Sequence, residues 1–180
     1  GQYSRQVDAA YFAPYLRSSI DVQQTQPQTR AENFDQQNLG AINSGTILQQ
    51  SFIRVVHTVT PAANVSIVGA YGDPQQTNKL MLVRFVSTGQ NVAFRVQNSD
   101  TDTGPALAFS QVSFEARADN PNNTGVGLDT DNTTVDLMFN GAVLQSYTGA
   151  ALRALSNTGT GIGTFSFQAT GGNTAFDQIR

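Results

Sequence analysis

The sequence contains no cysteine, and this absence removes several classes of chemistry together. Without a thiol there is no disulfide, no cysteine nucleophile, no cysteine zinc site and no iron–sulfur cluster. His57 is the single histidine, so there is no histidine cluster to hold a metal or relay protons. A chain of 180 residues buries about 70% of its unfolded surface, so one domain can form without disulfides or bound metal.

Charged residues are also scarce, at 13% of the chain, and the surface is rich in amides and hydroxyls instead. The net charge is −3, Lys79 is the single lysine, and nine arginines are spread singly. Nucleic-acid binding needs clustered cations, so this distribution argues against a nucleic-acid partner. No apolar run approaches the ~20 residues that cross a bilayer, so no membrane span is predicted. The start at Gly1 rather than Met fits a mature protein whose signal peptide has been removed, although a shortened chain would begin in the same way. The missing cysteine and the low charge lead us to expect a secreted or cell-surface protein.

What the sequence does have is hydrophobicity that alternates with a period of two, the pattern of half-buried strands. The segment 80–86 is apolar on both faces and predicts a central strand. About eight to ten strands with regular turn signals predict an all-β antiparallel sandwich or jelly roll. The predicted strands lie within residues 52–60, 65–71, 80–86, 92–96, 111–119, 135–139, 142–147, 164–169 and 174–180.

Two local features interrupt this pattern. Asn140-Gly141 stands between two alternating runs and predicts a tight hairpin, because a type I′ turn requires positive φ at both central residues. Residues 149–155 look helical, over a turn or two at most.

Residues 1–30 differ in kind from the rest and are interpreted as an N-terminal arm. This segment is rich in Gln and follows no strand pattern. Either it packs along its own domain or stays mobile, or it inserts into a neighbouring subunit as an added strand or as a short amphipathic plug. The candidate assembly residues are Tyr11, Phe12, Tyr15, Leu16 and Ile20.

Short motifs in residues 31–180 resemble the secreted bacterial laminin G-like, or concanavalin A-like, jelly rolls. The segment 31–35 (AENFD) with 39–43 resembles the opening strand and turn of that family. The segment 135–141 with Ser146-Tyr147 resembles its late hairpin, and 176–180 its closing strand. The resemblance implies a jelly roll over residues 31–180, with the first and last strands paired in one sheet. It also implies that Phe34 and Phe176 lie near each other in the core.

The catalytic residues of related sugar-cleaving enzymes are not evident. A glycoside hydrolase needs two carboxyl groups facing across a sugar, about 5 to 9.5 Å apart. The only two glutamates are Glu32, in the opening motif, and Glu115, beside Arg117 on the wet side of a strand. His57 has Arg54 nearby but no further partner and is interpreted as an ordinary strand residue. The sequence therefore favours a non-catalytic protein.

Calcium and a glycan are the ligands to consider. Asp129, Asp131 and Asp136 place hard oxygen ligands close together in the sequence, which suits calcium. The same residues are also the ordinary chemistry of a turn. Tyr147, Asn122 and Asn123 are candidates for sugar binding because they lie in or beside loops.

Three functions follow from these observations. The first is an extracellular structural, assembly or adhesive subunit that forms a homo-oligomer or polymer through residues 1–30. The second is a calcium-dependent carbohydrate-binding module. The third is a polysaccharide-degrading enzyme that uses Glu115 or His57.

Overall fold

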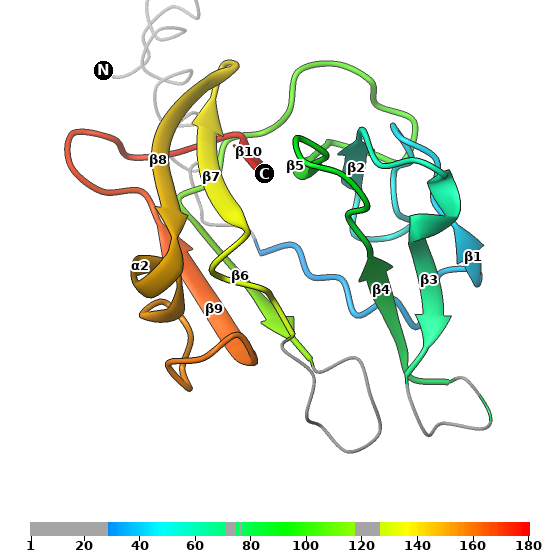
Figure 1. Cartoon of the computed structure of the whole chain (residues 1–180). Helices are drawn as coiled ribbons and strands as arrows, with labels where there is room; N and C mark the ends of the chain where they lie inside the picture. Colours follow the sequence, from blue (N-terminus) through cyan, green and yellow to red (C-terminus); the bar gives the residue numbers. More distant parts are fainter. Residues whose placement is uncertain (1–28, 71–74, 76, 118–126) are drawn as a thin grey trace, which may run out of the picture.

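Antiparallel strands make up most of the regular structure in the computed structural model (Figure 1). The structure describes residues 29–70, 75, 77–117 and 127–180. Ten strands, one 3-10 helix and one short α-helix lie in these residues, which confirms the all-β prediction. The strands are β1 (Gly40–Ala41), β2 (Ile53–His57), β3 (Val65–Gly69), β4 (Lys79–Val83), β5 (Val92–Val96), β6 (Gln111–Ala116), β7 (Thr134–Phe139), β8 (Ala142–Thr148), β9 (Gly163–Gln168) and β10 (Gln178–Ile179). The helices are η1 (Ala62–Asn64) and α2 (Gly149–Arg153).

The strands form one large sheet and two small ones. The five-stranded sheet has the order β2-β5-β10-β7-β8, and all of its neighbouring pairs are antiparallel. A three-stranded sheet has the order β1-β3-β4, and β6 pairs with β9 in a two-stranded sheet. Figure 1 shows β6 and β9 on the side of β7 and β8, and β3 and β4 on the side of β2 and β5.

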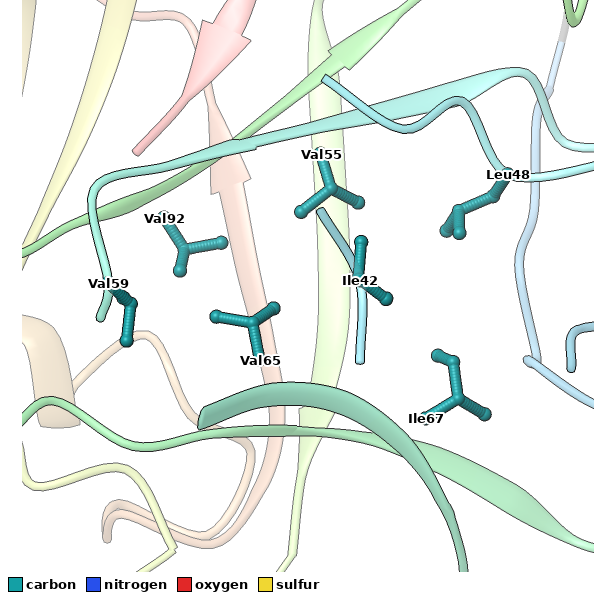
Figure 2. Packing of buried hydrophobic residues seen from close by; sticks show 7 residues of the cluster. All are labelled: Ile42, Leu48, Val55, Val59, Val65, Ile67 and Val92. Carbon is teal, nitrogen blue, oxygen red and sulfur yellow. The ribbon is translucent and has the colours of Figure 1, made fainter. Parts of the chain in front are cut away.

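Two hydrophobic clusters join the five-stranded sheet to the small sheets. In the first, Val55 and Val92 of the large sheet pack with Val65 and Ile67 of β3 (Figure 2). In the second, Leu137 and Ile179 of the large sheet pack with the side chains of β9, where Phe165 and Phe167 are fully buried. Phe94 on β5 packs against both clusters and so connects them. The second layer is therefore divided, whereas the first is continuous.

Local predictions agree closely with the structure. Asn140 and Gly141 join β7 to β8 with φ values of 54° and 83°, the two positive angles that the predicted hairpin requires. The predicted helical segment contains α2. On β6 the exposed and half-buried residues alternate strictly, as the sequence pattern predicted.

Three long-range predictions are wrong. The segment 80–86 was expected to form a central strand, but β4 stands at the end of its sheet. Phe34 packs against the first cluster and Phe176 belongs to the second, so they are not core neighbours. The opening β1 and the closing β10 lie in different sheets, because β10 inserts between β5 and β7. The last strand is placed by its pairing with β5 and β7, and not beside the strand that opens the chain.

Several expectations concern residues outside the described part of the chain. Tyr11, Phe12, Tyr15, Leu16 and Ile20, together with the rest of 1–28, lie outside it. Asn122 and Asn123 lie outside it as well. No helix among the described residues is long and apolar enough to cross a membrane.

The hairpin gives a direct test of the backbone argument. We expect Gly141→Ala to lower the free energy of unfolding by about 1 kcal/mol, because an alanine in the left-handed region is strained. The new methyl group meets no atom within 4 Å, so the cost comes from the backbone alone. Urea denaturation measures the change.

Gly172→Ala is the matched control for this substitution. A methyl group added at Gly172 also meets no atom within 4 Å, but the φ of this glycine is not positive. The unfolding free energy of this variant should stay the same or rise slightly, since an alanine restricts the unfolded chain. Equal losses in the two variants would refute the conformational explanation.

Candidate functional site

Glu32, one of the two candidate carboxylates, is occupied by structural hydrogen bonds. It accepts from the backbone N–H of Phe34 at 2.6 Å, from Nε2 of Gln37 at 2.9 Å and from Oγ of Ser51 at 2.8 Å. Gln37 and Ser51 are themselves buried. Glu32 therefore ties the 31–37 segment to the turn before β2, and this local network explains the acidic residue of the AENFD motif.

Asp35 of the same motif has a similar role. Its Oδ1 accepts the backbone N–H of Lys79 at 2.9 Å. The ammonium group of Lys79 returns to the carbonyl oxygens of Asp35, at 3.2 Å, and Gln37, at 2.7 Å. These contacts attach the opening segment to the start of β4.

Glu115 and His57 are held in separate surroundings. Glu115 is exposed on β6 and forms an ion pair of 3.5 Å with Arg117. His57 is buried on β2, with Nε2 at 2.8 Å from the carbonyl oxygen of Ile42. Its Nδ1 is buried without a hydrogen-bond partner. Glu115 belongs to the two-stranded sheet and His57 to the five-stranded sheet, so the two side chains are held by different sheets.

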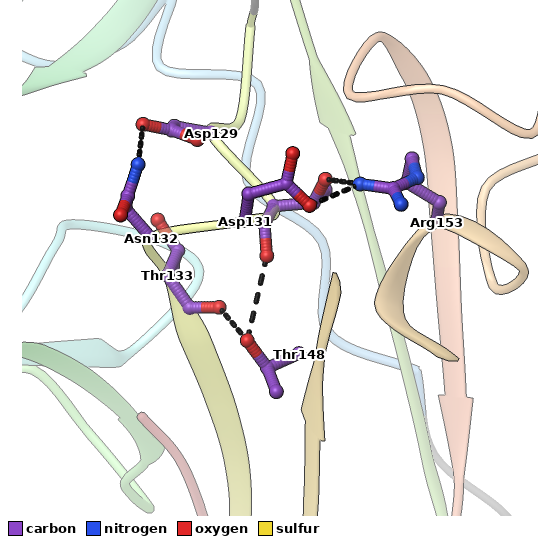
Figure 3. Close-up of polar contacts among 7 residues, drawn as sticks. Asp129, Asp131, Asn132, Thr133, Thr148 and Arg153 are labelled. Carbon is purple, nitrogen blue, oxygen red and sulfur yellow. Dashed lines mark hydrogen bonds and ion pairs between the residues drawn. The ribbon is translucent and has the colours of Figure 1, made fainter. Parts of the chain in front are cut away.

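The loop before β7 holds two of the predicted calcium ligands, each with a different partner (Figure 3). Oδ2 of Asp129 accepts from Nδ2 of Asn132 at 3.0 Å, an interaction within the turn. Oδ1 of Asp131 forms an ion pair of 2.5 Å with Arg153 on α2. Arg153 also donates to Oγ1 of Thr130 at 2.9 Å, so the loop is anchored to the helix.

Asp136, the third predicted ligand, lies on β7 and is buried. Its Oδ2 accepts from Arg180 at 2.6 Å, and its Oδ1 accepts from Oγ of Ser146 at 2.5 Å. Among the described residues, no three or more His, Asp or Glu side chains are grouped so that they could hold a metal ion. The structure thus does not bring Asp129, Asp131 and Asp136 together, and calcium binding stays a prediction.

Tyr147 packs against the second hydrophobic cluster. Its ring lies edge-on to Phe167, with 5.7 Å between the ring centroids. Its hydroxyl accepts from Nε2 of Gln145 at 2.6 Å. The ring is half-buried, and its proposed role in sugar binding stays a prediction.

The sequence interpretation missed polar residues in two neighbouring rows on the face of the five-stranded sheet that points away from the core clusters. Arg54 on β2 lies opposite Arg95 on β5, and Nε of Arg95 donates to Oε1 of Gln178 on β10 at 2.5 Å. Farther along, Arg180 meets Asp136, which faces Ser146 on β8. We call this set the polar face: Arg54, Arg95, Gln178, Arg180, Asp136 and Ser146. Each arginine was evident in the sequence as a lone charge in an alternating segment, but only strand register brings them together.

The two glutamates allow a comparison of a structural and an exposed carboxylate. We expect Glu32→Ala to lower the free energy of unfolding by about 1 to 3 kcal/mol, because it leaves part-buried donors unpaired. Glu115→Ala, the same chemical change at an exposed ion pair, should leave stability unchanged within error. Thermal and urea unfolding of both variants measure this difference. A neutral Glu32→Ala would mean that the network around it contributes nothing to stability.

Comparison with known proteins adds no function to this geometry. No protein-family model, curated protein or solved structure matches the chain. The resemblance to laminin G-like domains therefore stays a prediction. A function has to be inferred from the placement of the side chains described above.

Proposed function

We propose that this protein is a non-catalytic extracellular assembly subunit. In this proposal a jelly-roll-type sandwich is the body, and residues 1–30 form the contact with the next copy. The observation that carries it is the three-stranded sheet, which has apolar side chains on both faces and in which β4, within the described part of the chain, pairs with β3 alone. The amide- and hydroxyl-rich composition of the chain is compatible with an extracellular setting.

The inner face of this sheet is fully used by the core. Val65 and Ile67 on β3 are buried in the first cluster, and Met81 and Val83 on β4 pack against it. Side chains alternate between the two faces of a strand, so the residues between these point outward.

The outer face of the same sheet is also largely apolar. Val68 lies opposite Leu80, and Ser66 lies opposite Leu82. The three apolar side chains are half-buried and belong to neither core cluster. Just beyond β4, Phe85 and Val86 are 47% and 60% exposed. Large apolar side chains that are exposed together mark an interaction site more often than a solvated one, and Phe85 and Val86 are adjacent in the chain.

The edge of β4 strengthens this argument. Within the described residues, β4 pairs with β3 alone. Between Lys79, its first residue, and Arg84, which follows it, β4 consists of Leu80, Met81, Leu82 and Val83, and this stretch lacks the charged side chains that usually protect an edge strand. The sequence predicted a central strand here, and an added strand would make β4 central. We call β4 with Phe85 and Val86 the acceptor edge.

The N-terminal arm of a second copy is the partner that we propose for the acceptor edge. The described chain begins at Thr29, and Arg30 is fixed to the carbonyl oxygen of Gln97 at 2.9 Å. The 28 residues before it could extend to roughly 90 Å, which is enough to reach a neighbouring copy. Its aromatic and aliphatic residues can pair with the acceptor edge as a strand or cover it as a plug.

A charged substitution on the acceptor edge tests this proposal in the full chain. We expect the native chain to form dimers or larger species whose mass rises with concentration, as measured by light scattering. Leu82→Lys should shift the chain to monomers, because it places a charge on the apolar outer face. Ser113→Lys, on an exposed position of β6, is the control and should leave the mass unchanged.

Removing residues 1–28 tests the arm separately. The truncated chain keeps Arg30 and its hydrogen bond, and circular dichroism shows whether it retains the native strand content. We expect it to be monomeric at concentrations at which the full chain associates. If the full chain is monomeric, or if the truncated chain associates equally well, arm-mediated assembly is ruled out.

A further inference from the structure

Alternate N–H groups of β4 point away from β3, toward the acceptor edge. Just beyond β4, the N–H of Arg84 donates to the carbonyl oxygen of Asn64 at 2.8 Å, in register with the β3–β4 ladder. Because N–H groups alternate in direction along an antiparallel strand, the even-numbered residues of β4 face β3. The N–H groups of Lys79, Met81 and Val83 therefore point to the other side.

The opening segment takes the first of these N–H groups. Oδ1 of Asp35 accepts the N–H of Lys79 at 2.9 Å, and Nζ of Lys79 donates to the carbonyl oxygen of Gln37 at 2.7 Å. The N–H groups of Met81 and Val83 follow on the same side of the strand. The chain that leads to the arm is thus attached where the acceptor edge begins.

Arg30 fixes the other end of the opening segment. Its guanidinium donates to the carbonyl oxygen of Gln97 at 2.9 Å and lies over the ring of Phe52, 5.3 Å from the ring centroid. Phe52 has a φ of 58°, a left-handed conformation that is unfavourable for a large side chain. Gln97 and this strained residue hold Arg30, so the arm leaves the domain from a fixed position.

From that position the arm of a copy is long enough to reach the acceptor edge of the same copy. Asp35 follows Arg30 by five residues, so Arg30 lies within about 18 Å of the start of β4. Residues 23–29 can span about 24 Å. The residues before them can therefore lie along β4 without any change in the described domain.

Residues 15–22 of the arm have the alternating pattern of a strand. Leu16, Ser18, Ile20 and Val22 would share one face, and the residues between them from 17 to 21 are polar. The inner row of β4 is apolar and half-buried against the first cluster. A neighbouring strand of this pattern would extend the cover of that cluster.

We propose that residues 15–22 of each copy cover the acceptor edge of that same copy while the chain is monomeric. Assembly is then an exchange, in which the arm leaves its own edge and pairs with the edge of a second copy. The inference rests on the proposed function for the acceptor edge and adds an autoinhibited form to it. A tethered arm has an effective concentration on the order of millimolar, so it excludes a second copy from the edge at low protein concentration.

Amide hydrogen exchange of the full chain, measured by mass spectrometry of the β4 segment, tests this self-coverage. The concentration is one at which light scattering gives the mass of a monomer. Ser18→Pro and Ser19→Pro, made together, remove two adjacent N–H groups, one of which must face β4. We expect this variant to exchange the amides of Met81 and Val83 about tenfold faster or more, because prolines disrupt a paired strand.

Gln24→Pro and Thr25→Pro, made together, are the matched control. They introduce the same two prolines between the arm strand and Arg30, so the exchange of β4 should match that of the native chain. The amides of β3 should exchange equally in all three chains, because β3 is paired on both sides. All four substitutions lie in the arm, so the described domain has the same sequence in every chain.

Fast exchange of β4 in the native monomer would overturn self-coverage. If that exchange slows only as the mass rises, the edge binds a second copy alone, and the proposed assembly stands without the autoinhibited form. Equal exchange in the native chain and the Ser18→Pro, Ser19→Pro variant would also overturn the inference, because the arm would not be the segment that covers β4. Slow, arm-dependent exchange in a chain that stays monomeric at every concentration would support self-coverage and refute assembly.

Discussion

The alternation of side chains along antiparallel strands is the constraint on which the rest of the structure depends. Because successive residues point to opposite faces, the pairing of β2 with β5 sends Val55 into the core and Arg54 outward in the same step. A shift of one residue would exchange the two sets, burying the charge and exposing the valine. Core and polar face are therefore two consequences of one register.

The second layer is divided into two small sheets, which together cover the inner face of the five-stranded sheet. The large sheet is continuous, and its inner side chains need cover along its whole width. Two small sheets supply this cover separately, with Phe94 packing against both clusters. The division leaves β4 at the end of its sheet. An apolar edge strand results from the architecture itself, and our proposal of assembly rests on it.

The acidic residues that were candidates for a chemical role in the sequence have structural roles in the fold. Glu32 and Asp35 hold the opening segment to its neighbours, and Asp131 anchors a loop to α2. Arg54 and Arg95 are far apart in the chain and meet only through strand pairing. The significance of a charged residue depends here on its partner across the sheet.

The sequence by itself determined the strand content, the Asn140-Gly141 hairpin, the short helix and most of the core, because each depends on neighbours within a few residues. It could not determine that β10 inserts between β5 and β7, that β4 ends a sheet, or that Phe34 and Phe176 belong to different clusters. Nor could it place Arg54 opposite Arg95. Those features depend on which distant strands pair, and a period of two is equally compatible with many pairings. The choice among them is made by the packing of the whole domain.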